Sequence, residues 1–110
     1  MRDHDYWVYI VTNKTGSTLY IGMTNNIKRR IQEHRSGRVK GFTQRYSLNR
    51  LMWYEHFRDV RDAIACEKKL KGWLRARKVA LIAEKNPRWT DLSEEGFEQV
   101  PDVDNGDEFL

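Results

Sequence analysis

Residues 6–12, YWVYIVT, restrict the fold most strongly, because nearly every side chain on both alternations is aromatic or aliphatic. Successive side chains of a strand point to opposite faces of a sheet, so this strand is predicted to be covered on both faces. The turn residues NKTGS follow at 13–17, and TLYIGM at 18–23 has the composition of a returning strand. Residues 6–23 are therefore predicted to form a β-hairpin.

The next pattern predicts a helix and a third strand. The sequence TNN offers capping side chains before a helix over about residues 26–36, which Gly37 can end. A basic loop with two glycines follows. The sequence RLMWYEHF at 50–57 then has the composition of a strand.

Two further helices are predicted after that strand. Asp59 can cap a helix that runs through VRDAIACEKKLKGW, and Gly72 marks a break before LRARKVALIAEK. Asn86-Pro87 stops the second helix, and RWTDL at 88–92 is expected to pack on afterwards. The order ββαβαα predicts a small α+β domain, in which a three-stranded, mostly antiparallel sheet is flanked by helices.

The charge is uneven along the chain. Residues 1–90 contain all 20 Lys and Arg and 8 acidic residues, which gives +12, whereas residues 91–110 contain the other 8 acidic residues and no base, which gives −8. A body this basic indicates a phosphate-rich partner, most simply nucleic acid, and a solvated basic surface is the alternative. We predict a folded domain over 1–92 and an acidic, disordered tail over 93–110.

Several classes of protein do not fit the chain. No stretch approaches the roughly 18 apolar residues of a membrane span, and MRDHDYWVYI lacks the basic and apolar regions of a signal peptide. We therefore expect a cytoplasmic protein with no membrane partner. The single cysteine, Cys66, excludes an internal disulfide and a cysteine-based zinc cluster, and its helical context is typical of a small core residue.

The helix predicted over 26–36 carries polar residues on its apolar side. At about 100° per residue, Arg30 and His34 lie on the same arc as Ile27 and Ile31. Charged groups that face a sheet are costly unless they are paired or line a water-filled cleft. One interpretation is an arginine that reaches the surface beside a hydrogen-bonded core histidine, and the other is a functional site.

The following helix and the hairpin repeat this feature. Glu67 falls inside the apolar arc formed by Val60, Ala63, Leu70 and Leu74. A turn centred on residues 14–15 would place Tyr9 opposite Tyr20, and a turn centred one residue later would offset them by one pair. Gly22 lies on the same side as Tyr20 and is expected to leave room for a phosphate. Paired tyrosines are also typical of ordinary packing, so it is the combination that indicates a site.

These residues resemble the GIY-YIG nuclease superfamily. The second half of that name is literal in Tyr20-Ile21-Gly22, and the first half appears as Val8-Tyr9-Ile10, which keeps the tyrosine and lacks the glycine. The family pattern continues with an arginine, often a histidine, a glutamate on the next helix and, in many members, an asparagine. These positions correspond to Arg30, His34, Glu67 and Asn86. The resemblance covers about residues 5–92 and is to the small stand-alone bacterial members.

The resemblance implies a DNA endonuclease that hydrolyses phosphodiester bonds with one divalent metal ion, Mg²⁺ or Mn²⁺. Glu67 would supply a hard oxygen ligand to the metal, which neutralises charge on the scissile phosphate. Arg30 would bind the same phosphate through two N–H donors.

The resemblance also implies a division of the proton transfers. Tyr9 is the first choice of general base, with Tyr20 and His34 assisting by hydrogen bonds or a proton relay. Asn86 is included in the predicted catalytic set. Some family members have a lysine directly after YIG, where this chain has Met23.

Six basic residues on the outer arc of the first helix and in the loop after it are predicted to contact backbone phosphates: Lys28, Arg29, Arg35, Arg38, Lys40 and Arg45. No DNA-targeting domain is visible, so we expect weakly sequence-specific or structure-selective cleavage, in DNA repair or recombination, by a monomer or weak dimer. RNA stays open as a substrate. The alternative is a non-catalytic nucleic-acid-binding module that retains the fold.

Overall fold

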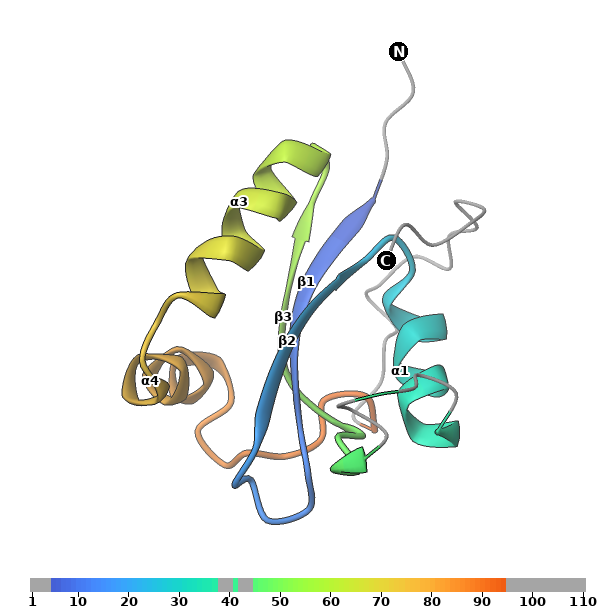
Figure 1. Cartoon of the computed structure of the whole chain (residues 1–110), viewed down its shortest axis with the longest axis vertical. Helices are drawn as coiled ribbons and strands as arrows, with labels where there is room; N and C mark the ends of the chain where they lie inside the picture. The colour runs from blue at the N-terminus through green and yellow to red at the C-terminus, as the bar shows by residue number, and fades with distance from the viewer. Residues whose placement is uncertain (1–4, 38–40, 42–44, 95–110) are drawn as a thin grey trace.

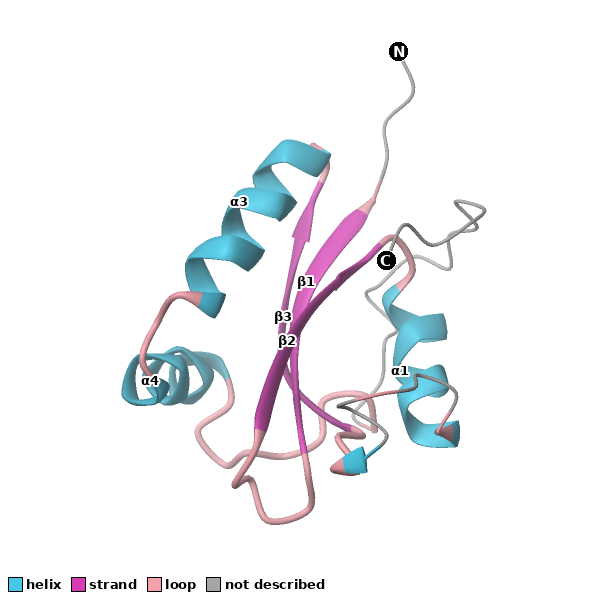
Figure 2. Ribbon diagram, in the orientation of Figure 1, coloured by secondary structure: helices cyan, strands magenta, loops and turns pink. Residues whose placement is uncertain are grey.

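The computed structural model describes residues 5–37, 41 and 45–94. The elements follow the predicted order ββαβαα, which confirms the α+β fold (Figure 1). They are β1 (Tyr6–Thr12), β2 (Leu19–Thr24), α1 (Ile27–Ser36), β3 (Arg50–Phe57), α3 (Val60–Lys71) and α4 (Arg75–Lys85). Figure 2 shows how these helices enclose the strands.

The sheet has the strand order β2-β1-β3, and both pairings are antiparallel. The central position of β1 explains why its side chains are apolar on both faces. Ile10 pairs with Trp53 and Val11 pairs with Leu51, so β3 carries one extra residue, Met52, at this point. The bulge lets Trp53 and Leu51 point to opposite faces although they are two residues apart.

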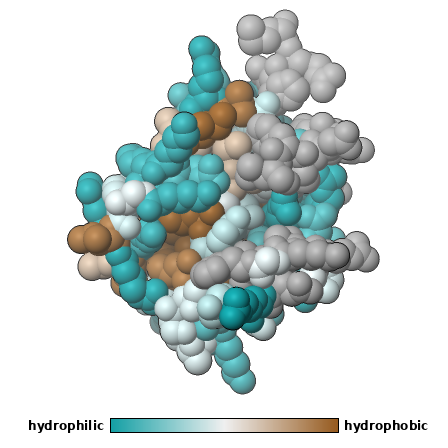
Figure 3. Space-filling view, viewed as in Figure 1, coloured by the Kyte–Doolittle hydropathy of each residue, from teal (hydrophilic) through white to brown (hydrophobic). Residues whose placement is uncertain are grey.

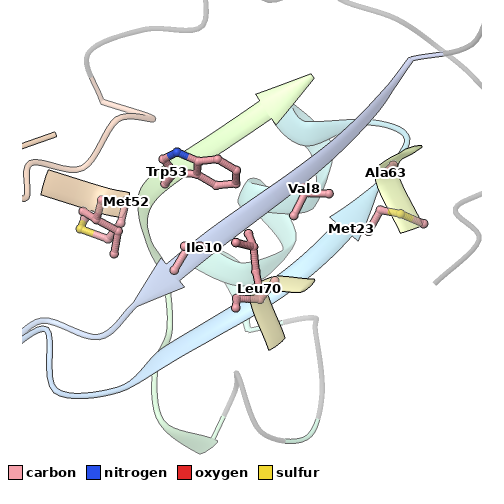
Figure 4. Close-up of a cluster of buried hydrophobic side chains, with 9 residues drawn as sticks. Val8, Ile10, Met23, Met52, Trp53, Ala63 and Leu70 are labelled. Carbon is pink, nitrogen blue, oxygen red and sulfur yellow. The ribbon is translucent and has the colours of Figure 1, made fainter. Parts of the chain in front are cut away.

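Helices cover both faces of the sheet, with α3 and α4 on one side and α1 on the other (Figure 1). The α3–α4 core is a cluster of buried apolar side chains: Val8, Ile10, Ile21, Met23, Met52, Trp53, Ala63, Leu70 and Ile82 (Figure 4). The α1 core contains Trp7, Tyr9, Val11, Ile27, Ile31, Leu48 and Leu51. The central strand thus contributes alternate residues to two separate cores, as its composition predicted.

The helix ends follow the signals in the sequence. Asn26 caps α1 with its side chain, and Gly37 ends that helix in a left-handed conformation, with φ of 75°. Asp59 caps α3 in the same way. The prediction that Leu74 shares the buried arc of α3 is wrong, because the break at Gly72 ends that helix first. Leu74 precedes α4 and is 82% exposed.

The chain after α4 returns to the α1 core. The N–H group of Leu92 donates to the carbonyl of Leu51 at 2.8 Å, and the Leu92 side chain packs against the α1 core. The buried carboxylate of Asp91 accepts from the N–H group of Leu51 at 3.1 Å. The expected packing of residues 88–92 is therefore confirmed. Of the tail predicted to be disordered over 93–110, Ser93 and Glu94 are described and donate hydrogen bonds to Asp91, whereas residues 95–110 lie outside the described part of the chain, where the disorder stays a prediction.

Hydrophilic side chains dominate the side of the molecule seen in Figure 3, and apolar side chains gather between the α3–α4 layer and the sheet. Among the described residues, every helix is too short or too polar to cross a lipid bilayer.

Candidate active site

A buried tyrosine–histidine pair lies between the sheet and α1. Tyr9 stands in the central strand and is 2% exposed, and its hydroxyl lies 3.0 Å from Nε2 of His34. The two rings meet edge to face, with their centroids 5.6 Å apart. His34 faces the sheet because it follows the buried Ile27 and Ile31 on the same side of the helix. The predicted inward orientation of His34 is confirmed, and Tyr9 is its partner.

Gly22 allows Tyr9 to occupy this position. The two residues are directly opposite in the register of β1 and β2. A Cβ atom at Gly22 would lie 2.5 Å from both Cζ and Oη of Tyr9, which is closer than non-bonded atoms approach. The tyrosine ring therefore fills the space that the sequence was expected to leave for a phosphate. The glycine serves to position the Tyr9 hydroxyl.

Tyr20 joins the pair from the edge strand. It is opposite Val11, whereas Tyr9 is opposite Gly22, so the two tyrosines are offset by two residues along the strands, which is the second of the two registers that the hairpin allowed. Tyr20 is half-buried, and its ring centroid lies 6.3 Å from that of His34. Because β2 is an edge strand, this side of the site lies where a ligand can approach.

Arg30 stands one turn before His34 on α1. Its side chain is 12% exposed, and Nη1 lies 3.5 Å from the carboxylate of Glu33. Burial and, to a lesser extent, the positive charge of Arg30 lower the pKa of His34 to about 4. The imidazole is therefore neutral at neutral pH. In the tautomer with the proton on Nδ1, Nε2 accepts a hydrogen bond from the hydroxyl group of Tyr9.

Glu67 approaches from the other face of the sheet. It belongs to α3, which packs against β1 and β2 on the side opposite α1 (Figure 1). Along the helix it lies between the buried Ala63 and Leu70, its side chain is 14% exposed, and its carboxylate pairs with Lys71 at 3.2 Å. The prediction that Glu67 lies on the buried arc is confirmed. Glu67 and Tyr9 lie on opposite faces of the sheet, however. One substrate could contact both residues only by reaching around the edge strand β2.

The carboxylate of Glu67 could serve as a single protein ligand of a hard cation, in place of its pairing with Lys71. Among the described residues, no three or more His, Cys, Asp or Glu side chains form a group that could hold a metal ion. Mg²⁺ does not require such a cage, since it keeps several waters and is often held by one or two carboxylates and substrate phosphates. The shielded carboxylate of Glu67 fits this mode of binding.

Asn86 ends α4 and is 4% exposed. Its amide N–H groups donate to the carbonyls of Met52 at 3.1 Å and Thr90 at 2.8 Å. Its oxygen accepts from the N–H and hydroxyl groups of Thr90, at 3.1 and 3.2 Å. These four bonds use the hydrogen-bonding capacity of the amide and tie the segment after α4 to the bulge in β3. Asn86 therefore has a structural role here, and its catalytic role stays a prediction.

The predicted phosphate-binding residues differ in their surroundings. Lys28 and Arg29 are half-buried on α1, and Arg45 is exposed in the segment before β3. Arg38 and Lys40 lie outside the described residues, so their role stays a prediction.

Arg35, the remaining member of that set, forms an ion pair that the sequence did not indicate. Its Nη2 donates to the carboxylate of Asp91 at 2.7 Å and lies 3.6 Å from the carboxylate of Glu94. Asp91 also accepts from Leu51 and Ser93, so it joins the C-terminal segment to both α1 and β3. The only local signal was the Asp-x-Ser sequence at 91–93, which is typical of a turn.

Comparisons with known proteins show which family the chain resembles in sequence and in fold. The chain matches the family described as GIY-YIG catalytic domain over residues 5–80. A UPF0213 protein of Bacillus pumilus is 32% identical over 84 residues, which are 76% of this chain and 85% of that protein. A UPF0213 protein of Clostridium perfringens is 33% identical over 93 residues, 84% of this chain and 94% of that protein. The solution NMR structure of a UPF0213 protein from Bacillus halodurans has a TM-score of 0.53 and 28% identity, and covers 82% of this chain and 95% of that one.

Proposed function

This chain belongs to the GIY-YIG family, and we propose that it is a metal-dependent endonuclease that hydrolyses phosphodiester bonds in DNA. The observation that carries the proposal is the buried hydrogen bond between Tyr9 and His34, with Arg30 one turn away. Each of these polar groups loses water when the chain folds, which costs stability. The α3–α4 core fills the opposite face with apolar side chains, so the polar groups are not a requirement of the fold.

Hydrolysis requires a water molecule to lose a proton as it attacks the phosphorus. We assign the role of general base, which accepts this proton, first to Tyr9, with Tyr20 and His34 assisting. The ordinary pKa of a tyrosine is about 10, so a free tyrosine is a poor base at neutral pH. The 3.0 Å contact with His34 offers a route, in which the Tyr9 oxygen takes the proton of water while its own proton passes to Nε2 of His34.

Arg30 couples this transfer to substrate binding. Its guanidinium can donate two hydrogen bonds to the scissile phosphate, and these strengthen as negative charge grows in the transition state. The positive charge of Arg30 is also one cause of the low pKa of His34. A bound phosphate offsets that charge, so His34 becomes a better proton acceptor when the substrate is present.

Glu67 is the residue that would hold one divalent ion, Mg²⁺ or Mn²⁺. When bound, the ion supplies positive charge at the scissile phosphate and at the leaving 3′-oxygen. The packing of α3 against β2 supports this role, because β2 is an edge strand and its residue Tyr20 packs against the α1 core. A phosphate at this edge would be accessible to residues of both helices.

The basic residues outside the site are proposed to bind nucleic acid without selecting a particular sequence. Lys28, Arg29 and Arg45 are proposed to contact backbone phosphates together with Arg38 and Lys40, and Arg35 must first leave Asp91 to do so. Such contacts give affinity that falls with salt and carry little sequence information. We therefore propose weakly sequence-specific or structure-selective cleavage, in cytoplasmic DNA repair or recombination, by a monomer or weak dimer.

Plasmid cleavage with the variant Glu67→Gln tests the proposal. The substitution keeps the size of the side chain and removes the charge that binds the metal, so cutting with Mg²⁺ or Mn²⁺ should be abolished. Glu84→Gln makes the same chemical change at an exposed position of α4 and should leave cutting intact. Undiminished cutting by Glu67→Gln would contradict the proposed role. Parallel assays on RNA define the nucleic acid.

A nucleic-acid-binding module without turnover is the second candidate. The ion pair between Glu67 and Lys71 favours it, because a carboxylate neutralised by its own helix binds a metal less tightly. This candidate predicts salt-dependent DNA binding with no cutting, and binding that does not change in Glu67→Gln. A binding titration beside the plasmid assay separates the two functions.

A further inference from the structure

A basic surface on α1 ends beside the acidic C-terminal segment. The outer side of the helix carries Lys28, Arg29 and Arg35 and one acidic residue, Glu33, whereas Arg30 is 12% exposed and belongs to the site described above. A hollow of about 150 Å³ is lined by Lys28, Ile31, Gln32, Arg35 and Ser93. The hollow therefore joins the basic side of α1 to the last described residues of the chain.

Acidic residues of the chain already occupy one end of this surface. Arg35 binds the carboxylate of Asp91 at 2.7 Å and lies 3.6 Å from the carboxylate of Glu94. The position of Asp91 is fixed, because it also accepts hydrogen bonds from Leu51 and Ser93. Glu94 is the last described residue, so the sequence beyond it starts at the α1 surface.

The sequence beyond Glu94 continues the same charge. Residues 95–110 contain no Lys, Arg or His and six acidic residues: Glu95, Glu98, Asp102, Asp104, Asp107 and Glu108. An extended chain advances about 3.3 Å per residue, so residues 95–110 can reach beyond α1, whose ten residues span about 15 Å. The segment has both the reach and the charge to bind this helix.

We propose that the acidic residues 95–110 bind the basic α1 surface and compete there with nucleic acid. The identity of the competing ligand rests on the proposed function, and the contact within the chain does not. Tethering gives such a segment an effective concentration of about a millimolar, so weak contacts between carboxylates and lysines or arginines suffice. The α3–α4 layer is also basic, but the ion pair of Arg35 places the start of the segment at α1.

The contact is tested in the full chain by neutralising the segment without shortening it, with the substitutions E95Q, E98Q, D102N, D104N, D107N and E108Q. At low salt, the backbone amide NMR signals of Lys28, Gln32 and Arg35 should differ between the native and the neutralised chain. The differences should disappear at high salt, because exposed charges are then screened. Unchanged α1 signals, or changes confined to α3 and α4, would overturn the proposal.

Competition is tested by titrating both chains with a short DNA duplex. The neutralised chain should bind about fivefold more tightly at low salt, since the tethered competitor is lost. Neutralisation also makes the net charge of the chain more positive, which by itself would strengthen DNA binding. The gain in DNA affinity is therefore measured in two further variants that each lack one lysine. Lys28→Gln should reduce the gain, whereas Lys68→Gln removes the same charge from an exposed position of α3 and should preserve it. Equal gains in the two backgrounds would overturn competition at α1.

The two proposals fail separately. Amide changes on α1 without DNA binding by either chain would support the contact and contradict the proposed nuclease function. DNA cutting with no amide changes on α1 would support the nuclease and overturn the contact.

Discussion

The two faces of the sheet bury different kinds of side chain. The α3–α4 core is a continuous apolar cluster (Figure 4), whereas the α1 face buries the hydroxyl of Tyr9 against the imidazole of His34, next to Arg30. Buried polar groups contribute less to stability than apolar ones, even when they are hydrogen-bonded. Both faces of this small sheet therefore contribute apolar side chains to a core, and the α1 face also buries the polar groups of the proposed site.

The largest expected effect is a loss of DNA cutting without a loss of stability, which would distinguish the role of the α1 face from that of the α3–α4 core. Arg30→Ala should lower the rate of DNA cutting by about 100- to 1000-fold, since it removes the donors to the phosphate. The melting temperature should stay the same or rise slightly, because active-site groups are often unfavourable for stability. Cleavage kinetics and thermal unfolding of the same preparation measure both quantities.

Arg77→Ala is the matched control on the other face. The Arg77 guanidinium lies 4.3 Å from the ring centroid of Trp73, at the surface of α4, and its removal should leave cutting intact. A large loss of stability in Arg30→Ala, with cutting preserved, would make the polar groups of the α1 face structural.

The second largest effect concerns the apolar face. Leu70→Ala should lower the free energy of unfolding by about 2–5 kcal/mol, because it leaves a cavity in the α3–α4 core. Cutting per folded molecule should be unchanged at a permissive temperature. Leu74→Ala makes the same change at a side chain that is 82% exposed, and should alter stability by less than about 0.5 kcal/mol. Urea unfolding compares them, and equal losses would contradict this description of the core.

Much of the fold could be predicted from the sequence because its signals are local. Asn26 and Asp59 provide helix caps, Gly37 ends a helix, and residues 6–12 show by composition that β1 is covered on both faces. The burial of Leu74 was predicted wrongly because the apolar arc of α3 was extended past the end of that helix at Gly72. Local signals therefore fix the elements and their order.

The arrangement of the site could not be predicted in the same way. His34 and Glu67 both lie on apolar arcs, and a helical pattern indicates the direction of a core but not which face of the sheet it covers. The position of the Tyr9 ring over Gly22 depends on the register of β1 with β2, for which two choices were open. The pairing of Arg35 with Asp91 joins residues 56 apart, which no local pattern reveals.

The polar face should also make stability depend on pH. Burial and Arg30 lower the pKa of His34 from 6.5 to about 4, so the unfolded chain takes up a proton at higher pH than the folded chain. The free energy of unfolding should therefore fall as the pH drops from about 6.5 to about 4, by up to about 3 kcal/mol, and this contribution should be constant above that range.

Urea unfolding at several pH values measures this dependence. His34→Gln cannot take up the proton, so it should lack the part of the slope that lies between pH 6.5 and 4. The same slope in both chains would show that another group causes it, and would remove the basis for a neutral, desolvated imidazole beside Tyr9.

A smaller loss of stability than that of Leu70→Ala is expected in the edge strand β2, where the ring of Tyr9 requires a glycine at position 22. Gly22→Ala places a methyl group 2.5 Å from Cζ and Oη of Tyr9, so the ring or β2 must shift. This should cost about 1–3 kcal/mol of unfolding free energy and impair cutting, because the hydroxyl moves away from His34.

A double-mutant cycle shows whether the tyrosine ring is the cause. In the background Tyr9→Leu, which removes the atoms nearest to Gly22, the same Gly22→Ala substitution should cost much less, and the difference is the coupling energy. An equal cost in both backgrounds would mean that the glycine serves the strand itself. A clear coupling would mean that the glycine of the edge strand is needed to seat the tyrosine of the central strand. The YIG and GIY segments would then be two halves of one contact, which explains physically why the glycine stands two residues after Tyr20.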